Sequence, residues 1–215
     1  MDPLKKSKAS FWSASNEEKI AQSPWEVLKT QPITSIEQEC LDRVFNHLCS
    51  QDPKKGEEFK RKIGPTDLMK KLTDLGLKLL RSEVALYIWE VDDDLDGYIS
   101  KDEFQIMYKR CRYDKSGLEP RKLYNLTQFL MYDKSNRGRV TVEETLQILF
   151  IRHGRDRLDY EIEAIFGQDE KNTDGTEKSI SFGEYLEKVN SRAIKEHFEK
   201  MKALKSVDKP EKDLD

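Results

Sequence analysis

A twelve-residue stretch from Asp92 to Glu103, DDDLDGYISKDE, constrains the fold of this chain more than any other part of the sequence. Acidic residues occupy its first, third and fifth positions, a glycine its sixth and a glutamate its twelfth. Short carboxylates at alternate positions converge when the chain turns tightly. Gly97 permits such a turn, because a residue without Cβ adopts it at low cost. The stretch therefore predicts a loop whose oxygen atoms surround one cation.

Calcium is the cation that this pattern favours. Ca²⁺ takes about six to eight oxygen ligands at about 2.3–2.6 Å, and the spacing D-x-[DN]-x-[DN]-G-x5-E supplies them. Glu103 is long enough to close the site with both oxygens, and Ser100 can ligate directly or through water. We expect one site, with ligands from the side chains of Asp92, Asp94, Asp96, Ser100 and Glu103 and the backbone carbonyl of Tyr98. The sequence leaves open whether Mg²⁺ fills it at rest.

The residues on either side of the loop have the spacing of helices. Ile88 and Val91 precede it, and Phe104 and Met107 follow it. A charged surface loop that matched the pattern by chance would not need these apolar flanks. A helix–loop–helix unit does need them, because its two helices must pack against each other.

A weaker version of the same unit recurs along the chain. A β-branched residue is followed four positions later by an acidic one at Ile63 and Asp67, Ile99 and Glu103, Val140 and Glu144, and Ile180 and Glu184. The spacings between successive members are 36, 41 and 40 residues, and such a period indicates a repeated structural unit. Residues 35–190 thereby resemble the EF-hand superfamily of calmodulin and troponin C. The resemblance implies an all-α fold with two EF-hand lobes, in which loops pair through short two-stranded contacts.

This layout divides the chain into five parts. We expect a flexible N-terminal arm at 1–32, an N-terminal EF-hand lobe at 33–112, a linker at 113–118, a C-terminal EF-hand lobe at 119–204 and a charged tail at 205–215. Ser35 with Gln38 is typical of a capping box, and Pro120 suits a first helical turn. A long helix is predicted from Phe182 to Leu204.

The other three loops depart from the pattern. The third, Asp133 to Glu144, has Arg137 where a carboxylate or amide is needed, so we expect it to keep its fold while binding calcium weakly or not at all. The fourth, Glu170 to Glu184, contains three extra residues, and binding there requires a distorted ring of ligands. The first, Cys49 to Asp67, is expanded and ends in an aspartate. We therefore expect one functional loop in four.

Composition and motifs narrow the class of protein. The 38 Lys and Arg against 41 Asp and Glu leave a net charge of −3, which argues against a nucleic-acid partner. Cys40, Cys49 and Cys111 lack a disulfide framework and are interpreted as reduced thiols. The longest apolar run, 148–151, is too short for a membrane anchor, so a cytoplasmic location is expected. No phosphate loop, nucleophile elbow or zinc-binding helix motif is present, and the three histidines lack metal-ligand spacing, so an enzyme is not expected.

Two further segments indicate contacts with other proteins. Phe11-Trp12 and residues 24–28 in the N-terminal arm are predicted to dock on a partner or to cover the protein's own core. Ile194, Phe198, Met201 and Leu204 form an apolar stripe on the last helix, which can pack on its own lobe or on a partner helix.

The sequence therefore favours a calcium-responsive regulatory subunit that binds a partner helix or peptide in an EF-hand lobe. The alternative is a structural subunit of a large assembly, such as the EF-hand subunits of ciliary axonemes and dynein-arm docking complexes, which the layout of the chain resembles. A calcium buffer is the third reading, and it does not explain three degenerate loops.

Overall fold

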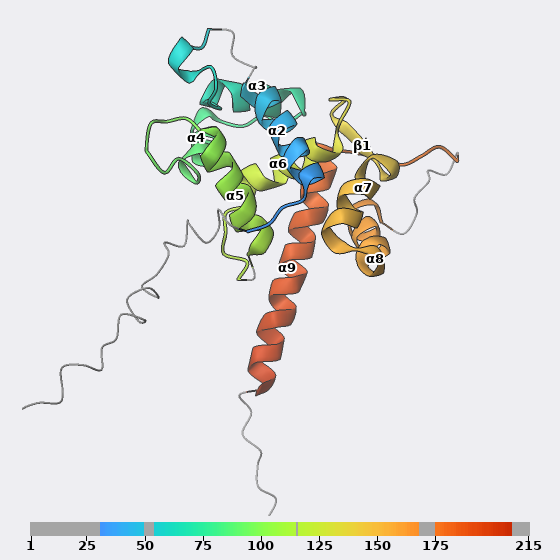
Figure 1. Ribbon diagram of the computed structural model, residues 1–215. Helices are drawn as coiled ribbons and strands as arrows, with labels where there is room; N and C mark the ends of the chain where they lie inside the picture. Colours follow the sequence, from blue (N-terminus) through green and yellow to red (C-terminus); the bar gives the residue numbers. More distant parts are fainter. Residues whose placement is uncertain (1–30, 50–53, 115, 168–174, 208–215) are drawn as a thin grey trace, which may run out of the picture.

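The computed structural model describes residues 31–49, 54–114, 116–167 and 175–207, and the predicted anchors at 11–12 and 24–28 lie outside these ranges (Figure 1). The described residues form eight α-helices and one two-stranded sheet, which confirms the all-α fold class. The helices are α2 (Ser35–Cys49), α3 (Pro65–Asp74), α4 (Arg81–Trp89), α5 (Lys101–Tyr113), α6 (Lys122–Tyr132), α7 (Val142–His153), α8 (Arg155–Phe166) and α9 (Phe182–Val207), with a 3₁₀ turn at Glu57–Phe59.

The loops pair as the repeat predicts. Strand β1 (Arg139–Thr141) is antiparallel to β2 (Ser179–Ser181), with Val140 opposite Ile180. Ile63 and Ile99 form an isolated antiparallel bridge with reciprocal N–H···O distances of 2.8 Å. All four of these β-branched residues are buried. Each pairing joins two neighbouring units, and this confirms the role assigned to the recurring β-branched position.

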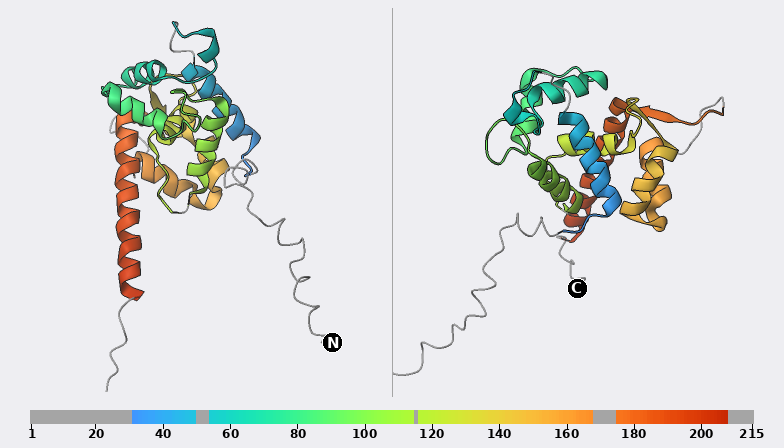
Figure 2. Two further views of the ribbon diagram at one scale, coloured as in Figure 1. Left: turned by 90° about the vertical axis from the view of Figure 1, so that its left-hand side faces the viewer. Right: turned by 45° about the horizontal axis from the view of Figure 1, so that its top comes forward.

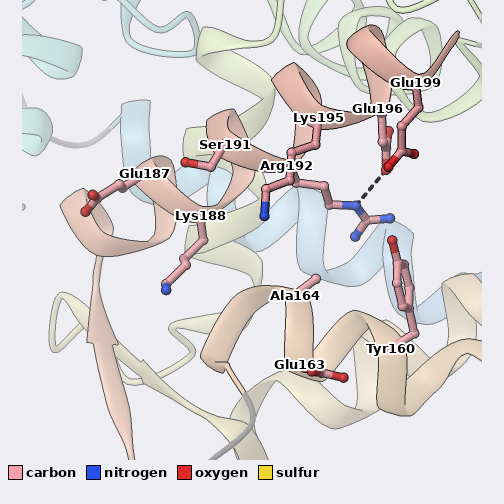
Figure 3. Close-up of a pocket in the computed structure, with 10 residues that line it drawn as sticks. All are labelled: Tyr160, Glu163, Ala164, Glu187, Lys188, Ser191, Arg192, Lys195, Glu196 and Glu199. Carbon is pink, nitrogen blue, oxygen red and sulfur yellow. Dashed lines mark hydrogen bonds and ion pairs between the residues drawn. The ribbon is translucent and has the colours of Figure 1, made fainter. Parts of the chain in front are cut away.

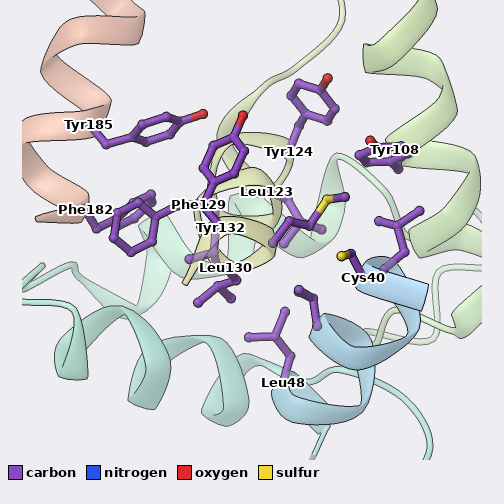
Figure 4. Close-up of a cluster of buried hydrophobic side chains, with 14 of the residues drawn as sticks. Cys40, Leu48, Tyr108, Leu123, Tyr124, Phe129, Leu130, Tyr132, Phe182 and Tyr185 are labelled. Atoms are coloured by element: carbon purple, nitrogen blue, oxygen red, sulfur yellow. The ribbon is translucent and has the colours of Figure 1, made fainter. Parts of the chain in front are cut away.

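Helix α6 lies at the centre of the molecule. It packs against α2, α5, α7 and α9, and nearly all of its side chains are buried. Figure 4 shows Tyr124 and Tyr132 of α6 between Tyr185 of α9 and Tyr108 of α5. A helix that is apolar on all sides belongs inside a core. One continuous apolar cluster includes residues from α2 to α5 and residues from α6 to α9. The boundary expected at 113–118 stays a prediction.

The segment between α5 and α6 folds around Asp114. Its carboxylate accepts hydrogen bonds from the backbone N–H groups of Ser116 at 2.8 Å and Gly117 at 2.9 Å. The Pro120 carbonyl accepts a hydrogen bond from the Cys111 thiol at 3.3 Å. Helix α6 begins at Lys122 with Arg121 as its N-cap, so Pro120 lies before the first helical turn and its predicted place in that turn is wrong.

The start of α2 also corrects the sequence reasoning. The capping pair is Thr34 and Glu37, with Glu37 N–H to Thr34 Oγ1 and Thr34 N–H to Glu37 Oε2 both at 3.2 Å. The Gln38 amide instead donates to Asp42 at 3.1 Å. The predicted pairing of Ser35 with Gln38 is wrong. The buried Glu37 carboxylate, which also binds Tyr108 of α5, caps the helix together with Thr34 instead.

Glu37 is the centre of a buried polar network. It accepts a hydrogen bond from the Tyr108 hydroxyl at 2.9 Å and lies 3.6–3.7 Å from the guanidinium groups of Arg112 and Arg152. Burial alone would raise the pKa of Glu37, but hydrogen bonds from Thr34 and Tyr108 and the two arginine charges outweigh burial and lower it. The network therefore holds α2 and α5 against α7.

Helix α9 begins in the core and leaves it. Phe182 and Tyr185 pack against Phe129 with ring centroids 5.1 and 5.7 Å apart. Arg192 then contacts Glu161 of α8 at 2.6 Å. Beyond this point the helix extends away from the other elements (Figures 1 and 2) and reaches Val207, three residues past the predicted end. The apolar side chains of Ile194, Phe198 and Met201 are exposed on it.

The three cysteines, Cys40, Cys49 and Cys111, are free and buried, as expected for reduced thiols. Within the described ranges, no helix combines the length and the apolar character needed to cross a membrane.

Candidate metal centre

The loop between α4 and α5 has the backbone shape that its sequence predicts. Gly97 adopts φ = 82°, in the left-handed region that favours glycine. Leu95 also adopts a positive φ, 59°, which the sequence did not indicate. In the third loop, Asn136 and Gly138 occupy the same positions and have φ values of 54° and 72°. The second and third loops therefore turn with a positive φ at the same two positions.

Three carboxylates converge inside the second loop. One oxygen from each of Asp92, Asp94 and Asp96 lies within 4.8 Å of the others. Asp92 accepts hydrogen bonds from Gly97 N–H at 2.8 Å and Asp96 N–H at 3.1 Å, so the backbone holds it in place. Burial raises the pKa of Asp92, and the neighbouring carboxylates of Asp94 and Glu103 act in the same direction. A bound cation would relieve this crowding of negative charge.

Glu103 reaches back across the loop from the first turn of α5. Its Oε1 accepts a hydrogen bond from Asp93 N–H at 2.8 Å, and its Oε2 accepts from Ser100 N–H at 2.8 Å and Ser100 Oγ–H at 2.7 Å. It lies outside the three-aspartate cluster. Glu103 and Ser100 thus form the capping box of α5, and the same carboxylate is directly linked to the loop.

Tyr98 directs its side chain away from the acidic cluster. Its ring stacks on Phe59 at a centroid distance of 4.1 Å and covers Gly64, where an added Cβ would lie only 2.8 Å from the ring. This position agrees with a role for Tyr98 through its backbone carbonyl, because the side chain belongs to the contact between the first and second loops.

Sequence reasoning missed Lys62, which comes from the first loop. Its ammonium group forms an ion pair with Asp96 and lies 3.7 Å from Asp94. The hydrogen bond with Asp96 raises the pKa of Lys62, so the group is charged at neutral pH. Lys62 directly precedes Ile63, which pairs with Ile99. That adjacency was the signal in the sequence that could have placed it beside the second loop.

In the third loop the chain supplies its own cation. The Arg137 guanidinium donates to Glu144 Oε1 at 2.7 Å and to Ser135 Oγ at 2.8 Å. Asp133 is fully buried and accepts hydrogen bonds from Gly138 N–H and Arg137 N–H, both at 2.8 Å. The guanidinium group therefore bridges two positions at which a calcium loop needs free ligand oxygens.

The first loop has a similar internal cation. The Lys55 ammonium contacts the Asp67 carboxylate and the Lys62 carbonyl and lies 3.5 Å from the Cys49 carbonyl. The side chains of Lys55 and Asp67 are both buried. Asp67 occupies the closing position of the loop. An ammonium group surrounded by carbonyl and carboxylate oxygens compensates there for the negative charge that a metal ion would otherwise neutralise.

Residues 170–174, which begin the fourth loop, lie outside the described residues. The second half of this loop includes β2 and Glu184, which accepts hydrogen bonds from Ser181 N–H and Oγ–H, both at 2.7 Å. Arg139 of β1 lies 3.7 Å from Glu184. The expectation about calcium at this loop stays a prediction.

Elsewhere, a groove of about 660 Å³ lies between α8 and α9 (Figure 3). Its lining residues are mainly charged: Tyr160, Glu163, Ala164, Glu187, Lys188, Ser191, Arg192, Lys195, Glu196 and Glu199. Arg192 crosses it to Glu161 and stacks over Tyr160 at 5.0 Å. These contacts tie α9 to α8, and the groove lacks the apolar lining typical of small-molecule sites.

Comparisons with known proteins agree with the geometry of the loops. Residues 60–111 match the sequence model of the EF-hand domain pair. The match covers the first loop from Lys60, α3, α4, the second loop and α5 as far as Cys111. A 75-residue segment, 35% of this chain, is 33% identical to the probable calcium-binding protein CML27 of Arabidopsis thaliana. The chain spans 39% of that relative's length. Residues 60–111 thus form an EF-hand pair, and these similarities, together with the converging aspartates, support calcium binding by the second loop.

Proposed function

We propose that this protein is a calcium-responsive interaction subunit that holds one calcium ion in the loop Asp92–Glu103. The ligands would be the side chains of Asp92, Asp94, Asp96, Ser100 and Glu103 and the carbonyl of Tyr98. The convergence of the three aspartates within 4.8 Å carries the proposal. Hard carboxylate oxygens are the donors that Ca²⁺ prefers, so the residues present fit the ion.

A bound Ca²⁺ supplies the positive charge that draws carboxylates of the loop together. The contacts of α5 determine which other helices respond when the carboxylates of the loop move. Glu103 stands in the first turn of α5, and Tyr108 and Arg112 lie further along the same helix. Tyr108 donates to Glu37 of α2, and Arg112 donates to the Arg152 carbonyl of α7 at 3.1 Å. A shift of Glu103 would therefore be transmitted through α5 to α2 and α7.

Exposed apolar side chains support a protein partner. Trp89 on α4 is 71% exposed, and Leu86 one turn earlier is 45% exposed. Ile194 and Phe198 on α9 are 57% and 60% exposed. Large apolar side chains grouped on a helix surface are characteristic of interaction sites. We propose that a partner helix or peptide covers one of these faces, together with contacts from the N-terminal arm, in the cytoplasm.

A second candidate is a structural subunit of a large assembly, such as a ciliary axoneme or a dynein-docking complex. The internal cations Lys55 and Arg137 favour it, because they allow two loops to fold without any metal ion. The extended α9 also favours it, since its exposed stripe suits a permanent contact. In this role calcium would only adjust a clamp that is already formed.

Calorimetric calcium titration in millimolar magnesium tests the site. We expect one site in the wild type, its loss in Glu103→Gln, and its retention in the matched control Glu144→Gln, which changes the same position of the third loop. Two sites in the wild type, or none, would contradict the proposal. Fluorescence of an apolar dye then separates the two roles. An increase with calcium indicates a responsive subunit, whereas an unchanged signal despite binding indicates a structural one.

A further inference from the structure

Lys62 places a positive charge at the edge of the proposed calcium site. Its ammonium group is paired with Asp96 and lies 3.7 Å from Asp94, and the side chain is 25% exposed. The backbone of the next residue, Ile63, is held to Ile99 by two hydrogen bonds. Lys62 is therefore held beside the site by the bridge between the two loops, and it does not reach the site from a freely moving segment.

The three described loops show a graded series of internal cations. Lys55 is buried against Asp67 at the closing position of the first loop, and Arg137 binds Glu144 at the closing position of the third. Lys62 instead contacts only the third and fifth positions of the second loop. Glu103, at the closing position, is engaged with backbone N–H groups and Ser100. Lys62 thus differs from Lys55 and Arg137 because it pairs with ligand positions other than the closing carboxylate, and a divalent ion can displace it.

We infer that Lys62 is an affinity-determining residue, which competes with calcium for Asp94 and Asp96 and so sets the calcium concentration at which this protein responds. The inference rests on the proposed function. A lysine on a flexible stem can swing into water when a divalent ion takes its partners, but its charge still repels the ion. Calcium binding must therefore break an ion pair and then tolerate a nearby cation.

Replacement by methionine removes this competition. A partly exposed ion pair contributes about 0.2–1 kcal/mol, which is roughly 1.4-fold to fivefold in a binding constant, and removing a nearby positive charge adds to this. We expect Lys62→Met to bind calcium about threefold to tenfold more tightly than the wild type. Methionine keeps most of the aliphatic stem, so the fold should be retained, and circular dichroism and thermal unfolding check this.

Two variants control for general charge effects. Lys60→Met removes the same charge two residues away, where the lysine pairs with Glu57 outside the site, and we expect less than a twofold change. Lys62→Arg keeps the charge and should restore an affinity close to the wild-type value. Dissociation constants are measured by competition with a chromophoric calcium chelator at fixed ionic strength.

The outcomes separate this inference from the proposed function. If the wild type binds calcium and Lys62→Met binds no more tightly than Lys60→Met, the role of Lys62 is refuted and the site stands. If neither the wild type nor Lys62→Met binds calcium, both fail. If Lys62→Met binds with higher affinity and Lys62→Arg does not, the competition is established.

Discussion

Arg137 should be the residue that keeps the third loop from binding calcium, and Arg137→Asp tests this by a gain of function. In the native loop, the Arg137 guanidinium donates to Glu144, and the Arg137 backbone N–H donates to Asp133. In the variant, three carboxylates stand at ligand positions and no guanidinium bridges them. The backbone already has the required shape, because Asn136 and Gly138 match the φ angles of Leu95 and Gly97.

The expected affinity is modest. Ser135 replaces the aspartate found at the third position of the second loop, so the variant has one carboxylate fewer than Asp92–Glu103. Affinity rises with the number of charged ligands, and we expect a dissociation constant on the order of 10⁻⁵–10⁻³ M. The third loop would then be the weaker of two sites.

Calorimetry of Glu103→Gln/Arg137→Asp isolates the new site, because the second loop is silenced. The control is Glu103→Gln/Lys134→Asp, which makes the same charge change at a non-ligand position, where the lysine side chain donates to Gln147. One site in the first double variant and none in the control would support the reasoning. No binding at about 10 mM calcium in the first double variant would refute the idea that Arg137 alone keeps this loop empty.

Two further predictions concern the buried network around Glu37. Tyr108→Phe removes a buried hydrogen bond to a carboxylate and should lower the free energy of unfolding by about 1.5–3 kcal/mol, against about 0.5–1.5 kcal/mol for Tyr185→Phe, whose hydroxyl donates to neutral Gln128. Urea unfolding in a chelator measures both, and equal losses would contradict the charged character of the first bond. Although burial alone would raise the pKa of Glu37, its hydrogen bonds and arginine neighbours lower it below the usual 4.5. Its contribution to stability is therefore present at neutral pH and is lost as the pH falls through about 4.5 and then through the folded-state pKa. The urea midpoint should fall between about pH 6 and pH 3.5, and a fall of the same size in Glu37→Gln would show that other groups cause it.

The sequence could predict the turn at Gly97 in the second loop because that turn is constrained locally, although the positive φ of Leu95 was not indicated. Gly97 needs a positive φ, and Asp92 must accept N–H groups from residues four and five positions ahead. The pairing of Ile63 with Ile99 was also visible, because a buried β-branched residue recurs at a nearly constant interval. These features depend on contacts within one unit or between units of equal length.

The cations in the loops were visible only in part. Arg137 lies inside the loop that it fills, so its sequence position alone predicted the effect. Lys55 belongs to an expanded segment without a regular pattern. Lys62 directly precedes the recurring Ile63, which places its backbone beside the second loop, but where its long side chain ends depends on tertiary packing. The cap at Thr34 was missed for a related reason. Two acceptable capping pairs overlap in the sequence, and only the buried position of Glu37 beside Tyr108 selects between them.

The internal cations also limit what calcium can change. Lys55 pairs with Asp67 in the first loop and Arg137 with Glu144 in the third, so a side-chain cation already faces the closing carboxylate of each loop. In the proposed function, the response therefore starts at Glu103 and passes along α5. Helix α5 contacts Glu37 and the Arg152 carbonyl, and we expect a responsive subunit and a structural one to differ in how these two contacts respond to calcium. In the first these contacts depend on the state of Glu103, and in the second they do not. Tyr108→Phe should therefore alter the calcium affinity of a responsive subunit, although Tyr108 lies outside the loop, and should leave that of a structural subunit unchanged.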